Sequence, residues 1–315
     1  MEELITNKHP NNFDDEISLE EIVGILWQGK WIITFITSLI SIIAVVYSLL
    51  LPNIYESKAL LVPVNSVGMT PGVMQSYSTI AGLAGINIPN NSDDNNAAKA
   101  MKKITSLSFF EDYILTNISL PNLMAVKFWD FETNTLVYDE DTYETNSKTW
   151  VRDYKYPMKQ IPSAQESFEV FIKEHISLSE DRDTGFVSLS IKHQSPFIAK
   201  QWSELVIDEV NNFYRTKDRL ESEKAVRYLN RQITTTGLSE IKQVIAQLLQ
   251  EETKKLTLIE ANKYYVFDYI DPPAVMELKS EPNRALICII IALFGGLLSV
   301  VIVLLNHYFL KEKAA

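Results

Sequence analysis

Residues 31–51 read WIITFITSLISIIAVVYSLLL and contain no Asp, Glu, Lys or Arg. A second uncharged and mostly apolar stretch covers residues 285–310 of the 315-residue chain. A helix needs about 20 apolar residues to cross a bilayer, so each stretch is long enough. The first stretch is also longer than the apolar core of a cleaved signal peptide, which has about 7 to 15 residues. The sequence therefore predicts two membrane spans and excludes a soluble enzyme.

These stretches divide the chain into five expected parts. They are a tail over residues 1–30, a span over 31–51, a large domain over 52–284, a second span over 285–307 and a tail over 308–315. The large domain has 25 basic and 32 acidic residues, and this net negative charge disfavours a nucleic-acid partner. The one cysteine, Cys288, lies in the second span, so the large domain has no disulfide and no thiolate chemistry.

The orientation of the spans follows from the length of the large domain. Two crossings place both tails on one side, and the Lys and Arg residues beside the spans favour neither side. Long loops translocate largely regardless of their charge, so we expect the tails inside and the large domain outside. Ser18 and Glu21 have capping-box spacing for a short helix before the first span. Trp27, Lys30 and Trp31 then suit an anchor at the membrane interface.

The large domain is expected to be α+β, with its base formed from residues 52–195 and 263–284. Period-two alternation and β-branched or aromatic residues predict strands over 55–64, 186–192 and 264–270. Residues 97–117 and 163–175 are predicted helices, and the Gly-, Ser- and Asn-rich stretch 65–96 is partly loop. Pro272, Pro273 and Pro282 predict a stiff connector into the second span.

Residues 126–162 are aromatic and acidic and allow two interpretations. Exposed aromatic rings would stack on sugar rings, whereas buried ones would fill a β-rich core. Burial is the usual role of aromatic side chains, so the second interpretation is preferred. The aromatic residues are Trp129, Phe131, Tyr138, Tyr143, Trp150, Tyr154 and Tyr156.

Residues 196–262 predict a long helical hairpin. Pro196 suits a helix start, and no helix breaker follows until Gly237, which gives a helix of about 60 Å. Seven of the ten residues in 215–224 are charged, so this part has little neighbouring core and is expected to project from the base. A second helix returns after Gly237, and its apolar face is buried within the pair or against a neighbouring subunit. That face is Leu238, Ile241, Ile245 and Leu248.

Small residues recur along both spans. In the first span they follow a spacing of three and four residues, and they form one stripe on the helix. Small residues let helices approach closely in lipid, so the two stripes are expected to pack on each other, or one of them receives a helix of a partner protein. The alternative is that small residues are simply common in membrane spans and that the stripes have no packing role. The residues are Thr34, Thr37, Ser41, Ala44 and Ser48, and Ala292, Gly295, Gly296 and Ser299.

Several motifs, in a fixed order relative to the two spans, resemble the Wzz-type chain length determinants, which are polysaccharide co-polymerases. The amino end carries ISLEEIVGILWQGKWII (17–33) and, after the span, YESKALLVP (55–63). The motifs of the carboxyl half are SPFIAKQWSELV (195–206), YLNRQI (228–233), YYVFDYIDPP (264–273) and SEPNRAL (280–286).

The resemblance implies a bacterial inner-membrane protein with a periplasmic α/β base and a long helical extension, assembled into a bell-shaped homo-oligomer. It implies a non-enzymatic role with the integral-membrane O-antigen polymerase, setting the number of repeats in the lipopolysaccharide. The implied partners are further copies of the chain, that polymerase, undecaprenyl-linked polysaccharide and membrane lipid. The runner-up is an adaptor for capsule or exopolysaccharide polymerisation or export, working with a separate kinase or an outer-membrane exporter.

We expect no catalytic residue, cofactor or metal site. Residues 24–30 have P-loop spacing, but Trp31 stands where Ser or Thr would bind magnesium, and no strand precedes them. The four histidines, His9, His175, His193 and His307, are scattered without metal-ligand spacing. A tyrosine kinase or a sensor would need a cytoplasmic domain, and tails of this length leave no room for one.

Overall fold

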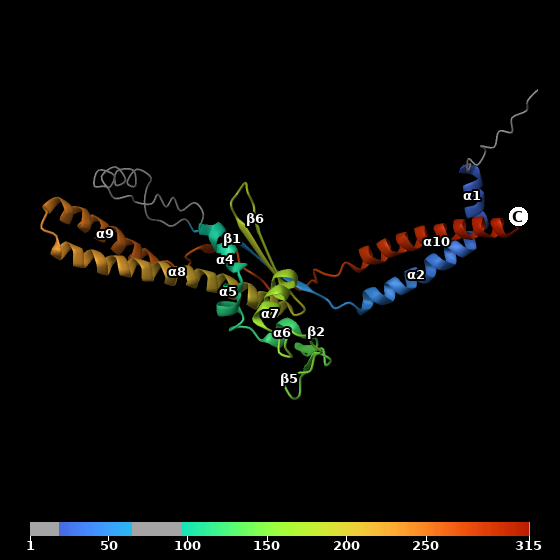
Figure 1. The fold of residues 1–315 in the computed structure, drawn as a ribbon, viewed down its shortest axis with the longest axis horizontal. Helices are drawn as coiled ribbons and strands as arrows, with labels where there is room; N and C mark the ends of the chain where they lie inside the picture. Colours follow the sequence, from blue (N-terminus) through green and yellow to red (C-terminus); the bar gives the residue numbers. More distant parts are fainter. Residues whose placement is uncertain (1–18, 65–95, 315) are drawn as a thin grey trace, which may run out of the picture. The chain divides into compact units, whose positions relative to one another are not determined.

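A computed structural model of the protein describes residues 19–64 and 96–314 (Figure 1). The predicted loop over 65–96 lies outside the described residues except for Asn96, and Ser18 of the capping box lies outside them too. The chain forms two compact units, one from the residues up to Pro52 and from Pro282 onward, the other from Asn53 to Glu281. We call them the membrane unit and the large unit. The expected mixture of helix and sheet with two helices of membrane length is confirmed.

The described part of the membrane unit, residues 19–52 and 282–314, contains three helices. A short helix α1 (Leu19–Gln28) leads through Gly29 into α2 (Lys30–Leu50), and α10 (Arg284–Ala314) lies beside α2 (Figure 1). Residues 30–50 and 284–307 are long and apolar enough to cross a membrane, with mean hydropathies of 2.4 and 3.1. Large apolar side chains such as Phe35 and Phe294 are exposed, while Ala44 and Ser299 are buried. Large apolar groups outside and small groups inside is the arrangement expected of helices that face lipid.

The large unit is built on one antiparallel sheet. Its strands are β1 (Tyr55–Pro63), β6 (Ile176–Glu180), β7 (Val187–His193) and β8 (Phe267–Asp271), in the order β6-β7-β1-β8. In β7, Val187, Leu189 and Ile191 are fully buried and the residues between them are not. This alternation is the pattern that predicted the strand, because one face of the sheet is covered.

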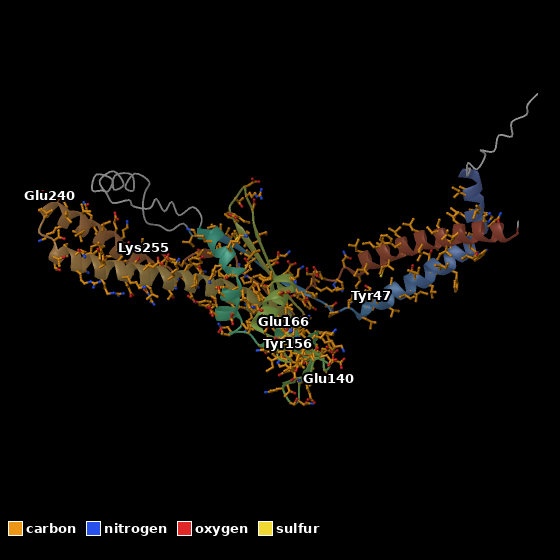
Figure 2. The ribbon with its side chains drawn as sticks, viewed as in Figure 1. Tyr47, Glu140, Tyr156, Glu166, Glu240 and Lys255 are labelled. Atoms are coloured by element: carbon orange, nitrogen blue, oxygen red, sulfur yellow. The ribbon has the colours of Figure 1, made fainter. Side chains whose placement is uncertain are left out.

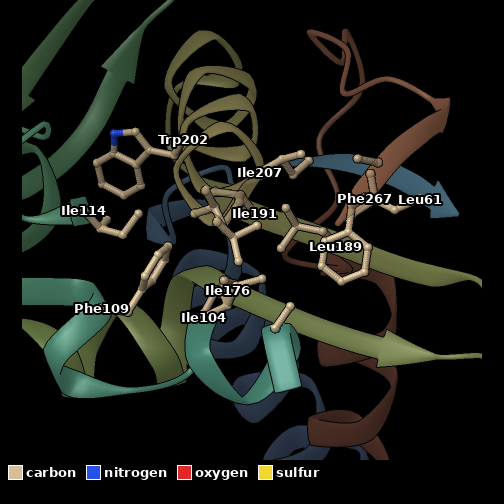
Figure 3. Close-up of a cluster of buried hydrophobic side chains, with 14 of the residues drawn as sticks. Leu61, Ile104, Phe109, Ile114, Ile176, Leu189, Ile191, Trp202, Ile207 and Phe267 are labelled. Atoms are coloured by element: carbon tan, nitrogen blue, oxygen red, sulfur yellow. The ribbon is translucent and has the colours of Figure 1, made fainter. Parts of the chain in front are cut away.

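Helices cover the inner face of the sheet and complete the core (Figure 3). They are α4 (Asn96–Ile104), α5 (Leu107–Phe109), α6 (Leu120–Met124) and α7 (Ala164–Val170), with the π-helical turns η1 (Phe110–Ile114) and η2 (Phe171–His175). Residues 97–117 are thus helical over most of their length, as predicted, but the helix is interrupted. It breaks at Ser106, whose backbone is extended and whose hydroxyl accepts a hydrogen bond from the N–H of Phe109. A serine cap competes with helix continuation and starts a new helix there.

Residues 126–162 form a small lobe of two hairpins. The strands are β2 (Val126–Asp130) with β3 (Thr135–Tyr138), and β4 (Tyr143–Glu144) with β5 (Thr149–Trp150). None of the seven aromatic residues named above is buried, and Phe131 and Tyr156 are 73% and 95% exposed. The preferred interpretation that they fill a β-rich core is therefore wrong. Tyr143 and Trp150 are half-buried in contact with each other, and Trp129 is half-buried beside Tyr55 of β1 and Phe197.

Two long helices complete the large unit. Helix α8 (Pro196–Thr235) begins in the base, where Trp202, Val206 and Val210 are buried against the sheet and the neighbouring helices. Beyond Asn211, Ser222 is the only buried residue of α8, and α9 (Ser239–Ala261) packs alongside. Charged residues such as Glu240 and Lys255 lie exposed on α9 (Figure 2). The first half of α8 thus belongs to the base, and only the second half forms the expected extension with α9.

Candidate functional site

The small residues of the two candidate spans lie against each other. Ala44 and Ser48 of α2 and Ser299 of α10 are buried. The hydroxyl oxygens of Thr37 and Ser299 are 3.3 Å apart and share a hydrogen bond between the helices. The Ser41 hydroxyl donates to the carbonyl of Thr37, at 2.8 Å, within its own helix. The two small-residue stripes thus pack on each other in the structure. That one of them receives a helix of a partner protein stays a prediction.

Glycines set how closely these helices approach. A Cβ at Gly295 would lie 2.8 Å from Cγ2 of Ile40, closer than side chains tolerate, whereas one at Gly296 would lie 4.0 Å from the Thr37 hydroxyl. A Cβ at Gly29, between α1 and α2, would lie 2.4 Å from Cγ1 of Val303. Ala292 is half-buried on α10. Among the glycines described in the membrane unit, Gly29 and Gly295 therefore leave the least space for a side chain.

The apolar face of α9 is divided between two environments. Ile245 is 8% exposed and Leu248 is half-buried, because both lie on the side of α9 that packs on α8. Leu238 and Ile241, next to the turn of the hairpin, are 61% and 45% exposed. The face is thus buried within the pair at Ile245 and open at the turn, and contact with a second copy stays a prediction for Leu238 and Ile241.

Asn211 joins α8 to the start of β8, a connection that was not predicted from the sequence. Its side-chain oxygen accepts hydrogen bonds from the N–H groups of Tyr265, Val266 and Phe267, at 3.2, 2.7 and 3.0 Å. Its amide nitrogen donates to the Phe267 carbonyl at 3.1 Å. The side chain is buried. The sequence contains one signal for this connection, because Asn211 is a polar residue between the apolar Val210 and Phe213. A buried amide needs hydrogen-bond partners, so its position there indicates that such partners exist.

Two of the histidines that look scattered in sequence lie together in the core. The rings of His175 and His193 are 5.7 Å apart between centroids, and both contact Trp202. His193 Nδ1 accepts a hydrogen bond from the N–H of Ser195 at 2.9 Å, so Nε2 carries the proton and donates to the Asn122 carbonyl. His175 Nδ1 bonds the Lys192 carbonyl at 2.7 Å. Within the described residues no third metal-ligating side chain joins them.

Burial lowers the pKa of both histidines, and it lowers the pKa of His193 to about 4. Because the folded pKa of His193 is below its unfolded value of about 6.5, its contribution to stability is complete above pH 6.5 and falls as the pH drops to 4. We expect acidification from pH 7 to 4 to remove about 3 kcal/mol of stability through this residue. The measurement is the melting temperature of the full chain in detergent as a function of pH.

A His193→Gln variant is the control, because carboxylates also titrate in this range. Burial raises the pKa of the Glu56 carboxyl, but hydrogen bonds with Ser190 and Ser280 outweigh it and lower the pKa. A hydrogen bond with Arg152 likewise lowers the pKa of Glu166 against the effect of burial. The variant should melt lower at pH 7 but lose less stability on acidification. Equal losses in both proteins would show that His193 carries no pH dependence.

The connector after β8 runs back along the start of β1. The Ser57 hydroxyl donates to the Ala274 carbonyl at 2.9 Å, and the N–H of Ser280 donates to the Ile54 carbonyl at 2.8 Å. Lys192 and Glu281 form an ion pair of 2.6 Å. Of the three prolines expected to stiffen the connector, Pro273 is buried, Pro272 is exposed and Pro282 is half-buried.

Among curated proteins, none matches the chain. A solved structure of a full-length bacterial polysaccharide co-polymerase has 14% identity and a TM-score of 0.43, covering 95% of this chain and 100% of that one. A fragment of WzzB, a polysaccharide co-polymerase from Salmonella Typhimurium, has 12% identity and a TM-score of 0.33, covering 73% of this chain and 100% of that one.

The match to a family model is more specific. The model of the Wzz family, chain length determinant protein, matches residues 15–114. Within the described residues this range includes α1, α2, β1 and the helices α4 and α5 of the core. It also contains the two amino-terminal motifs of the resemblance, 17–33 and 55–63, but not the four of the carboxyl half. The chain is thus similar to the Wzz chain length determinant proteins, as its sequence motifs indicated.

Proposed function

We propose that this chain regulates the O-antigen chain length of lipopolysaccharide, as a non-enzymatic co-polymerase that acts on the inner-membrane polysaccharide polymerase. In this proposal α2 and α10 span the bacterial inner membrane, both termini are cytoplasmic and the large unit is periplasmic. The chain works as a homo-oligomer, and growing undecaprenyl-linked polysaccharide passes near it.

The match of residues 15–114 to the chain length determinant model carries this proposal. The membrane unit supports it, because α2 and α10 expose large apolar side chains and bury small ones. A soluble helix pair would bury the large side chains instead, since burial of apolar surface drives its association.

A non-enzymatic role is supported by the position of the one motif with P-loop spacing. Residues 24–28 lie in helix α1, and Gly29 leads directly into α2. A P-loop needs a flexible turn after a strand, with its N–H groups free to bind phosphate. Here the Lys30 ammonium lies 4.7 Å from the centre of the Trp27 ring, a cation–π contact that suits the interfacial anchor.

The test is the lipopolysaccharide profile on a silver-stained gel. A strain that lacks its own length regulator should show an unclustered ladder, and expression of this chain should restore a clustered band distribution. The profile should be compared at matched levels of the protein in the membrane. If surface polymer instead appears only when the chain is expressed, the chain is an export adaptor and the proposal is wrong.

A further inference from the structure

One loop of the hairpin lobe carries a set of large apolar side chains away from any core. Residues 153–161 follow β5 and precede α7. Tyr156, labelled in Figure 2, is 95% exposed, and Tyr154, Met158 and Ile161 are each more than half exposed. Four such side chains within eight residues of one loop exceed what scattered surface apolar residues explain.

Arg152 holds this loop in a single arrangement. Its guanidinium donates to the carbonyls of Lys159 and Gln160, at 2.6 and 2.9 Å, and forms a bidentate pair with Glu166 in the first turn of α7. The Gln160 side chain donates to the Trp150 carbonyl at 2.6 Å. The Arg152 side chain is itself largely buried. A charge-assisted network of this kind fixes the backbone of the loop and leaves its apolar side chains pointing to solvent.

The charges on the loop indicate whether a protein partner or a lipid bilayer covers it. Lys155 and Lys159 are exposed, and Asp153 is the only acidic residue between Arg152 and Ile161. Lysine is depleted from the cores of protein interfaces, which argues against a protein partner. Tyrosine and lysine often occur together at membrane interfaces. There the tyrosine rings lie at the level of the lipid headgroups, and the lysine ammonium groups bind lipid phosphates.

We propose that residues 153–161 dock on the surface of an anionic phospholipid bilayer. Tyr154, Tyr156, Met158 and Ile161 enter the headgroup region, and Lys155 and Lys159 bind lipid phosphate. The inference rests on the proposed membrane anchoring of the chain. Only residues 51–54 separate α2 from β1, and α10 begins three residues after Glu281. Such short tethers keep the local concentration of bilayer high, so a weak docking equilibrium is populated.

The test places a solvent-sensitive probe on the loop of the full chain. Tyr156→Cys in a Cys288→Ser background is labelled with an environment-sensitive fluorophore and reconstituted in nanodiscs of phosphatidylcholine alone or of phosphatidylcholine mixed with the anionic lipid phosphatidylglycerol. We expect protection from iodide quenching only with the anionic lipid. Lys155→Gln with Lys159→Gln should shift the docking equilibrium about thirtyfold toward the exposed state, the factor that two lysines at such a surface provide.

Two control sites make the outcomes distinct. A label at Leu238→Cys, an exposed apolar position at the turn of the α8–α9 hairpin, should stay quenchable in both nanodiscs. A label at Leu39→Cys on α2 should be protected in both, and its exposure would contradict membrane anchoring itself. Quenching at residue 156 in anionic nanodiscs overturns the docking proposal. Protection already present in detergent, without bilayer, overturns it too, because a second copy or another protein segment then covers the loop.

Discussion

Replacing Asn211 with leucine is expected to lower the free energy of unfolding of the large unit by about 4 kcal/mol or more. The change leaves three N–H groups and one carbonyl at the start of β8 without their partner. Each buried polar group left unsatisfied costs about 1–3 kcal/mol, and a domain of this kind has only about 5–15 kcal/mol in total. We therefore expect a chain that is cleaved rapidly by protease under native conditions in the membrane.

The neighbouring residue offers a matched control. Asn212 is exposed on the same helix, so Asn212→Leu should leave protease resistance almost unchanged. Asn211→Asp keeps the acceptor for the three N–H groups and loses only the donor, so it should fall between the two. Equal resistance of Asn211→Leu and Asn212→Leu would mean that β8 is held without this side chain.

Substituting leucine for Gly295 is expected to separate the paired helices of the membrane unit. Even a Cβ there lies 2.8 Å from Ile40, so a larger side chain must push α2 away, and overpacking of this kind costs roughly 1–3 kcal/mol. Thr37→Cys with Ser299→Cys, in a Cys288→Ser background, reports the pairing because the two hydroxyls are 3.3 Å apart. We expect the disulfide to form efficiently with Gly295 and poorly with leucine. The clustered O-antigen profile should broaden in parallel.

The adjacent glycine distinguishes a packing effect from a general one. At Gly296 the space allows a methyl group, because the nearest atom would be 4.0 Å away, so Gly296→Ala should leave both the cross-link and the profile intact. Ser41→Leu, on the same stripe of α2, should broaden the profile because Ser41 is half-buried there. An unchanged cross-link in Gly295→Leu would show that the helices pair elsewhere. A lost cross-link with an unchanged profile would separate helix pairing from length control.

The spans and the sheet could be predicted because their signals are local. An uncharged run of 21 residues and the alternation in Val187–Ile191 each report burial directly through composition or period. The break at Ser106 was missed because capping depends on the backbone angles of a single residue. The aromatic lobe was assigned the wrong environment because ring burial depends on whether a second layer exists, and no pattern within residues 126–162 encodes that.

Contacts between residues that lie far apart in the chain could not be predicted from the sequence, for a different reason. Asn211 meets residues more than 50 positions away, and His193 meets the carbonyl of Asn122. Such partners depend on the order and register of the strands, for example Leu61 opposite both Val187 and Tyr269. One sequence contains no record of which strands become neighbours. The candidate spans and small-residue stripes could therefore be found, and the polar contacts that hold the base together could not.

The sheet order has a consequence for how the chain is made. Strand β1 leaves the ribosome first, yet its neighbours β7 and β8 are encoded far downstream. At about 5–20 residues per second, the time between Leu61 and its partner Tyr269 is roughly 10–40 seconds, during which the edge of β1 that pairs with β8 stays unpaired. β8 ends at Asp271 and α10 begins at Arg284. Closure of the sheet and entry of the second membrane helix therefore fall within seconds of each other at the end of synthesis.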